Sequence, residues 1–243
     1  MTYWVVVAAA GVGQRMQADC PKQYLPLAGS TVIEQTIARL RDLPGLSGIL
    51  VSLAADDVHW QRLRIAHDPM IRRIDGGSER CHSVLNALCA LDSLADPDDW
   101  VLVHDAARPC VHRDDLQRLT AAACADAVGA LLAYPVRDTM KRQTVDGRGA
   151  RRVGSTENRV GLWHALTPQL FRLQPLREAL QAALAAGQVV TDEAEAMERR
   201  GWSPMLVEGR ADNIKVTRPE DLMLAEFYLR RRRVGAAAPP DHQ

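Results

Sequence analysis

The sequence predicts an α/β fold with a mostly parallel central sheet and a projecting β-arm. Through the first half of the 243-residue chain, apolar runs of strand length alternate with helical patterns that keep one face apolar. Such alternation produces a parallel sheet covered by helices on both sides. After Pro135 the alternation stops, and residues 140–152 are polar and basic around the turn signal Asp146-Gly147-Arg148-Gly149. We therefore expect a hairpin arm, the alternative being a floppy insertion.

The predicted strands are short, mostly apolar runs. They lie at residues 4–9, 48–54, 71–74, 100–104 and 129–134, with two more around 205–207 and 214–216. The first predicted helix starts at a capping box of Thr31 and Glu34 and keeps Ile33, Ile37 and Leu40 on one face. Further helices are expected near residues 57–66, from 84 to 91, at 114–125, at 176–186 and near 192–200, and residues 217–220 cap a last helix that runs to about residue 231.

Length and composition point to one domain in the cytoplasm. We expect a single domain over residues 1–232, an arm at about 137–159 and a disordered, solvated tail at 233–243. Thirty basic and thirty acidic side chains cancel, so bulk charge indicates neither a nucleic-acid nor a membrane partner. The five cysteines form no CxxC pair, which argues against a disulfide framework or a zinc site and fits a reducing compartment. No apolar run approaches the roughly 18 residues of a membrane span.

A glycine-containing loop follows the first predicted strand. It reads Ala8-Ala9-Ala10-Gly11-Val12-Gly13-Gln14-Arg15-Met16 and continues to Pro21-Lys22-Gln23. Glycines let backbone N–H groups approach a phosphate, and the two cations can neutralise one. A dinucleotide fingerprint needs a third glycine where Met16 stands, and a Walker loop needs Gly-Lys-Ser/Thr, which is absent from the sequence. We interpret the segment as a nucleoside triphosphate loop; a simple glycine turn with solvated charges is the alternative.

Three other polar segments also follow predicted strands, at residues 75–80, 105–108 and 137–141. Ligands of open parallel sheets bind beyond the carboxyl ends of the strands. We therefore expect one rim to collect a set of mostly cationic side chains around one carboxylate: Arg15, Lys22, Arg80, Asp105, Arg108 and Thr139. A polyphosphate with its metal ion explains such a rim better than isolated turn residues do.

The second segment with a strong signal is Val101-Leu102-Val103-His104-Asp105-Ala106-Ala107-Arg108-Pro109. Asp105 emerges from an apolar strand, so its charge needs compensation. Mg²⁺ accepts one or two carboxylates together with substrate phosphates, and we assign Asp105 to metal and substrate positioning. The alternative is an Asp105–Arg108 ion pair that shapes the turn. His104 is expected to be a packed strand-end residue without a catalytic role.

A glycine pair precedes the predicted helix that contains Ser83. Asp75-Gly76-Gly77-Ser78-Glu79-Arg80 offers backbone donors and acceptors close to a helix start. A backbone carbonyl there would accept from the amino group that cytosine has and uracil lacks. A structural Gly-Gly turn with Ser83 as a helix-start residue is an equally open interpretation.

Taken in order, these motifs resemble the 2-C-methyl-D-erythritol 4-phosphate cytidylyltransferase family of the non-mevalonate isoprenoid pathway. The resemblance covers residues 4–230. Besides the segments above, it includes Pro135-Val136-Arg137-Asp138-Thr139-Met140-Lys141, the run Gly161-Leu162-Trp163-His164-Ala165-Leu166-Thr167-Pro168-Gln169, Thr191-Asp192-Glu193-Ala194, and the stretch from Gly209 to Thr217. It implies a Rossmann-like nucleotidyltransferase fold, dependence on Mg²⁺ and a homodimer joined through the arm.

The resemblance also implies roles for individual residues. Arg15 and Lys22 would stabilise the transition state, and Lys215 and Arg159 are further catalytic candidates. The residues expected around CTP are Ala9, Ala10, Gly11, Gly13, Gly77, Ser78, Ser83 and Ala106. Asp105, Arg108, Thr167, Thr191 and Lys215 would orient methylerythritol phosphate, and Thr139 and Arg159 would reach the substrate phosphate of the partner subunit. Some relatives carry an acidic residue in place of Ser78.

Two other functions compete with this one. A relative that transfers CMP to another polyol phosphate, such as ribitol 5-phosphate, would share the nucleotide loop; the segments around Thr139 and Thr167 favour the methylerythritol type. A nucleotide-binding regulatory protein without catalysis is disfavoured because Arg15, Lys22, Asp105 and Lys215 are all present.

Overall fold

A seven-stranded sheet forms the centre of the molecule. The computed structural model describes residues 1–11, 16 and 18–237, and within them the strand order is β11-β7-β10-β6-β1-β4-β5. The strands are β1 (Tyr3–Ala8), β4 (Leu46–Leu53), β5 (Ile71–Asp75), β6 (Trp100–Asp105), β7 (Gly129–Pro135), β10 (Trp163–Arg172) and β11 (Met205–Glu208). Strand β10 pairs antiparallel with β6 and β7, and the other neighbours pair in parallel. The predicted mostly parallel α/β fold is confirmed.

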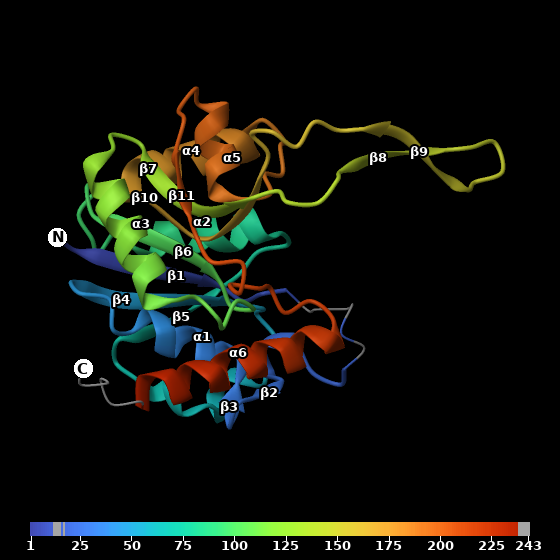
Figure 1. The fold of residues 1–243 in the computed structure, drawn as a ribbon. Coiled ribbons are helices and arrows are strands. Elements are labelled where there is room, and N and C mark those ends of the chain that lie inside the picture. Colours follow the sequence, from blue (N-terminus) through green and yellow to red (C-terminus); the bar gives the residue numbers. More distant parts are fainter. Residues whose placement is uncertain (12–15, 17, 238–243) are drawn as a thin grey trace, which may run out of the picture.

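The central strands are buried on both faces, which explains their unbroken apolar runs. Along β1, Val5 and Val7 pack into one core cluster, and Trp4 and Val6 pack into the cluster on the opposite face. This alternation is the two-residue period of a strand. Helices α1 (Val32–Leu40) and α3 (Arg113–Ala125) supply the first cluster; α2 (Arg80–Ala90), α4 (Leu173–Ala185) and α5 (Glu193–Arg199) supply the second. Figure 1 shows these two helical layers on either side of the sheet.

Helix α1 begins as its sequence predicts. The Thr31 hydroxyl accepts from the Glu34 N–H, and the Glu34 carboxylate accepts from the Thr31 N–H, which completes the capping box. Short strands β2 (Pro26–Leu27) and β3 (Ser30–Thr31) precede it. A 3-10 turn at Lys22–Tyr24 connects them to the loop after β1.

Two predicted elements are wrong. Residues 57–66 form 3-10 turns, Trp60–Arg62 and Arg64–His67, because the Asp57 carboxylate caps the N–H groups of residues 59 and 60 in a tight turn. Residues 214–216 form no strand; Val216 instead donates its N–H to the Ala107 carbonyl. The strand β10 was not among the predicted elements.

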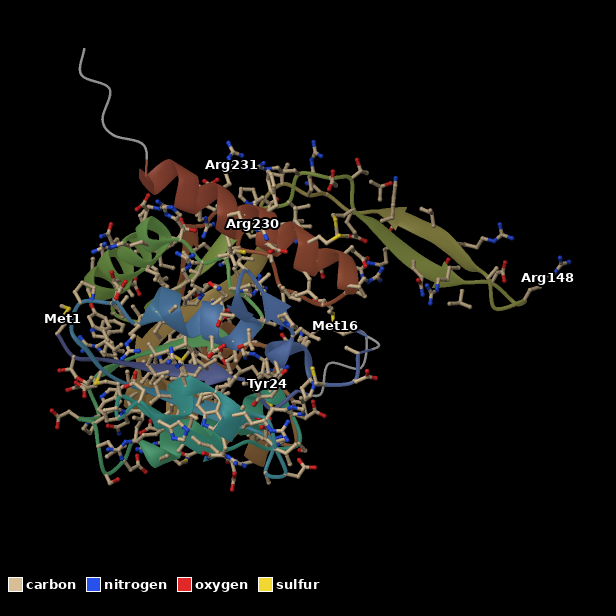
Figure 2. All side chains as sticks on the ribbon, turned by 90° about the horizontal axis from the view of Figure 1, so that it is seen from below. Met1, Met16, Tyr24, Arg148, Arg230 and Arg231 are labelled. Carbon is tan, nitrogen blue, oxygen red and sulfur yellow. The ribbon has the colours of Figure 1, made fainter. Side chains whose placement is uncertain are left out.

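The arm is a two-stranded hairpin of β8 (Lys141–Val145) and β9 (Arg151–Thr156), and every residue of both strands is exposed. Figure 1 shows it projecting far from the body, and Figure 2 shows Arg148 at its tip. The hairpin prediction is confirmed. Helix α6 (Pro219–Ala237) runs beyond its predicted end at about residue 231. Among the described helices, none has the length and apolarity needed to cross a bilayer.

Candidate active site

A cavity of about 250 Å³ lies at the carboxyl ends of β1 and β6. It is bounded by the loop after β1, the turn before α2, the loop after β6 and the segment before α6. The residues that line it are Ala8, Ala9, Ala10, Gly11, Lys22, Gln23, Gly77, Ser78, Glu79, Arg80, Ser83, Asp105, Ala106, Ala107 and Lys215. Ten of the predicted site residues therefore lie at one place: Ala9, Ala10, Gly11, Lys22, Gly77, Ser78, Ser83, Asp105, Ala106 and Lys215. The strand-end rule predicted that the segments of Lys22, Gly77 and Asp105 would meet, whereas Lys215 was predicted from the family resemblance alone.

The glycine-containing loop forms one wall of the cavity. Arg15 and Gly13, two of its predicted site residues, lie outside the described residues. The Lys22 ammonium donates to the Val216 carbonyl at 2.8 Å, which ties the loop to the segment that carries Lys215. Beside it, the buried Gln23 amide donates to the Ala9 carbonyl at 2.8 Å. The loop is thus fixed where it leaves the sheet.

The glycine pair before α2 allows a close approach of two backbone segments. A Cβ atom at Gly76 would lie 2.5 Å from the Ala10 Cβ and 2.9 Å from the Ser83 Oγ, so only glycine fits without a shift. The Ser83 hydroxyl accepts from the Gly77 N–H at 3.0 Å and lies 3.1 Å from the Glu79 carbonyl oxygen, to which it donates. Ser83 therefore shapes the turn as well as lining the cavity, which supports the structural interpretation of this residue.

The Asp105 carboxylate lies among three cationic side chains. Arg80 Nε donates to Oδ1 at 2.9 Å, Lys215 Nζ lies 2.8 Å from Oδ2, and Arg108 Nε lies 3.5 Å from Oδ2. Burial alone would raise the pKa of Asp105, but Arg80, Lys215 and Arg108 together hold it well below its usual range. Asp105 is therefore ionised, and it fixes the positions of three cations at the rim.

A second buried carboxylate, that of Glu193, was not predicted as a site residue from the sequence. It is fully buried at the first residue of α5, where its Oε1 and Oε2 accept from Arg80 Nη1 and Nη2 at 2.7 and 3.0 Å. Burial would lower the pKa of Arg80, but Glu193 and Asp105 outweigh it and hold that pKa above its usual value. The Arg80 guanidinium therefore lies between the carboxylates of Asp105 and Glu193, which are 88 residues apart in the sequence.

The loop after β6 is held by His104 and Thr167. The Asp105 N–H donates to the Thr167 hydroxyl, which lies 3.0 Å from His104 Nδ1, and His104 Nε2 lies 3.0 Å from the Arg108 carbonyl. Because a carbonyl can only accept, Nε2 carries the proton and Nδ1 accepts from Thr167. Burial lowers the pKa of His104 to about 4, so the ring is neutral. His104 is a packed strand-end residue, as the sequence predicts, and Thr167 lies behind the cavity wall.

Four further predicted residues lie outside the set that lines the cavity. Arg108 donates to the Asn213 carbonyl at 2.8 Å, and its side chain is only 12% exposed. Thr191 donates its hydroxyl to the Glu195 carboxylate at the start of α5. Thr139 and Arg159 lie at the exposed base of the arm, where the Arg159 guanidinium donates to the Arg137 carbonyl. Thr139, Thr191 and Arg159 are thus not among the residues that line the cavity with Lys22, whereas Arg108 contacts the lining residue Asp105.

The donor set does not fit a resident metal ion. Both Asp105 oxygens contact cations, and both Glu193 oxygens accept from Arg80. Among the described residues, no three His, Cys, Asp or Glu side chains gather in a cluster that could hold a metal. The assignment of Asp105 as a metal ligand has no support in this geometry, and the alternative ion pair with Arg108 is present as part of a larger charge cluster.

Comparisons with known proteins agree on one family. Residues 3–231 match the family model described as IspD: 2-C-methyl-D-erythritol 4-phosphate cytidylyltransferase. The protein of that name from Pseudomonas fluorescens (strain SBW25) is 58% identical over 221 residues, covering 90% of this chain and 92% of the relative. That from Vibrio cholerae serotype O1 is 53% identical over 228 residues, covering 93% and 95%. The crystal structure of the Francisella tularensis protein superposes with a TM-score of 0.81 at 36% identity, covering 94% of this chain and 100% of that one.

Proposed function

This chain belongs to the 2-C-methyl-D-erythritol 4-phosphate cytidylyltransferase family, and on that premise we propose how its cavity performs the reaction. The enzyme transfers CMP from CTP to 2-C-methyl-D-erythritol 4-phosphate, giving 4-diphosphocytidyl-2-C-methyl-D-erythritol and pyrophosphate. A phosphate oxygen of the acceptor attacks the α-phosphorus of CTP. The new P–O bond forms as the bond from the α-phosphorus to the bridging oxygen breaks, and pyrophosphate leaves with that electron pair.

The observation that carries the proposal is the pairing of Arg80 and Lys215 with Asp105 in a cavity that Lys22 also lines. A phosphate monoester is largely ionised at neutral pH, so its attack needs no strong general base. The obstacle is repulsion between two anions, together with charge that builds on the leaving oxygens. Fixed cations oppose both without reorganising. We assign this task to Lys22 and Lys215, with Arg15 as the guanidinium that suits forked contact with phosphate oxygens.

Two walls of the cavity consist of small residues and leave room for a nucleotide. Ala9, Ala10 and Gly11 on one side and Gly77 with Ser78 on the other leave backbone groups free of bulky side chains. We propose that CTP lies between these walls, with its base against the turn before α2. Magnesium then enters as part of the nucleotide substrate, held by the triphosphate, because Asp105 and Glu193 are already engaged by cations.

The arm supports a homodimer. A hairpin with both strands fully exposed is marginal by itself in water, so a partner surface is expected to cover it. We propose that the partner is a second copy and that Thr139 and Arg159 reach the acceptor phosphate at the neighbouring cavity. Their separation from the cavity of their own chain supports this assignment.

Five cysteines without a disulfide support a reducing cytoplasm as the compartment.

A pyrophosphate-release assay tests the proposed function. CTP and Mg²⁺ are combined with the protein and with methylerythritol phosphate, ribitol 5-phosphate or no acceptor. We expect release that requires methylerythritol phosphate and is at least tenfold slower with ribitol 5-phosphate. Faster release with ribitol 5-phosphate would reassign the acceptor, and release that ignores the acceptor would remove the transferase assignment.

A further inference from the structure

Glu193 is a buried carboxylate that the proposed reaction does not use. It is fully buried, and it begins helix α5, where negative charge is favoured by the helix dipole. Two side chains hold the helix start: the Asp192 carboxylate accepts from the Glu195 N–H at 2.9 Å, and the Gln169 side-chain amide oxygen Oε1 accepts from the Ala194 N–H at 2.8 Å. The backbone that carries Glu193 is therefore hydrogen-bonded in place at the start of the helix.

Its two oxygens accept from the two terminal nitrogens of Arg80, which is the forked geometry that fixes a guanidinium in plane. The remaining Nε of Arg80 then points at Asp105 Oδ1. With Oδ1 held by Arg80, the Oδ2 atom is turned to Lys215, whose ammonium lies 2.8 Å away. The contacts thus form one chain of ion pairs, from Glu193 through Arg80 and Asp105 to Lys215.

We propose that Glu193 is a positioning residue for the transfer reaction, acting through Arg80 and Asp105 to fix the Lys215 ammonium at the cavity. This inference rests on the proposed role of Lys215 in the transition state. Lys215 sits at the open end of the chain of ion pairs, with its side chain 39% exposed, whereas Glu193 is 1% exposed at the closed end. In this proposal Glu193, at the buried end, fixes the position of Arg80, and Lys215, at the exposed end, contacts the substrate.

The test is a double-mutant cycle between Glu193→Gln and Lys215→Ala, read as kcat with saturating CTP and acceptor. The glutamine amide has about the volume of the glutamate carboxylate. Its NH₂ group is a donor, however, so it cannot accept from one of the two Arg80 nitrogens that Glu193 binds. We expect Glu193→Gln to lower kcat by roughly 10- to 100-fold, the scale of a small misplacement of a reacting group, with little change in the KM for CTP. In the Lys215→Ala background the same substitution is expected to change kcat less than about threefold, because residues acting as a unit are not additive.

Exposed Glu198 on the same helix provides the matched control, and Glu198→Gln is expected to keep the wild-type kcat. Unfolding midpoints are measured for every variant, and a Glu193→Asp variant tests rescue by charge. A wild-type kcat for Glu193→Gln, or a full multiplicative loss in the Lys215→Ala background, overturns the positioning role and leaves the proposed function intact. A wild-type kcat for Lys215→Ala itself removes both the proposed role of Lys215 and the positioning inference.

Discussion

The neutral, buried imidazole of His104 predicts a specific loss of stability in acid. Its ring bridges the Arg108 carbonyl and the Thr167 hydroxyl, and burial lowers its pKa from 6.5 to about 4. Between these values the unfolded chain binds a proton that the native protein does not. Stability therefore falls as the pH drops from 6.5 towards 4. The difference of about 2.5 between the two pKa values, at about 1.4 kcal/mol per pH unit, corresponds to about 3.5 kcal/mol. About 2 kcal/mol of this is lost between pH 7 and pH 5.

The assay is urea unfolding at pH 7, 6 and 5, followed by tryptophan fluorescence, on the wild type and on His104→Gln. The glutamine amide can still donate to the Arg108 carbonyl, but it does not titrate. Other groups that titrate are common to both proteins and cancel in the comparison. We expect the wild type to lose about 2 kcal/mol more than the variant between pH 7 and pH 5. The exposed His67→Gln variant is the matched control for loss of an imidazole. Equal pH dependence in wild type and His104→Gln would refute the reasoning.

Four further expectations concern the site and its scaffold. Lys22→Ala should lower kcat by roughly 10²–10³-fold in the pyrophosphate-release assay, the scale for one electrostatic stabiliser, and a near-wild-type rate in the folded variant would exclude Lys22 from the mechanism. Arg159→Ala should mainly raise the KM for methylerythritol phosphate, and mixing its chains with Lys22→Ala chains should recover activity if sites are shared across a dimer; no recovery would assign each site to one chain. Gly76→Ala places a Cβ 2.5 Å from the Ala10 Cβ, so urea unfolding should show a loss of about 1–3 kcal/mol, and unchanged stability would contradict the close approach. Thr31→Ala removes a capping-box hydroxyl and should cost about 1 kcal/mol in the same measurement while kcat stays at the wild-type value; a loss of kcat would link α1 to the site.

The sequence was sufficient to predict most of the sheet and its functional rim. Continuous apolar runs identified the parallel strands because residues on both faces of those strands are buried. The strand-end rule then predicted that Lys22, Gly77 and Asp105 would share one rim, and the structure has them at one cavity, which Lys215, predicted from the resemblance, also lines. These successes rest on local patterns and on one general property of parallel sheets.

The strand β10 was missed because its sequence argues against a central strand. Pro168 lies in the middle of Trp163–Arg172, and proline cannot donate to a ladder on either side. The structure accommodates it at an irregular register between Ala165 and Gln169, where pairing with β7 is interrupted. The pairing with the neighbouring strand decides whether a proline ends a strand or lies at such an interruption. The local sequence pattern carries no information on that pairing.

Glu193 was missed for a different reason. An acidic residue in the first turn of a helix is explained locally by the helix dipole, so within the motif Thr191-Asp192-Glu193-Ala194 only Thr191 was predicted as a site residue. Its partner Arg80 is 113 residues away and begins another helix. The signal lies in the structure, where the Glu193 carboxylate is buried and its neighbours Gln169 and Ala194 carry no charge. A buried acid of this kind requires a distant cation.

Within the charge cluster, exposure separates the group that we propose to meet substrate from the groups that we propose to hold the site together. Arg108 and Lys215 both contact Asp105 Oδ2, but Arg108 is 12% exposed and also donates to the Asn213 carbonyl. Lys215 is 39% exposed, and an ammonium has three N–H donors, of which Asp105 needs one. A phosphate arriving from the open side can therefore bind Lys215 without displacing Asp105. The carboxylate then works by holding cations in place against their mutual repulsion, so that the energy needed to gather them is supplied during folding and not during the reaction.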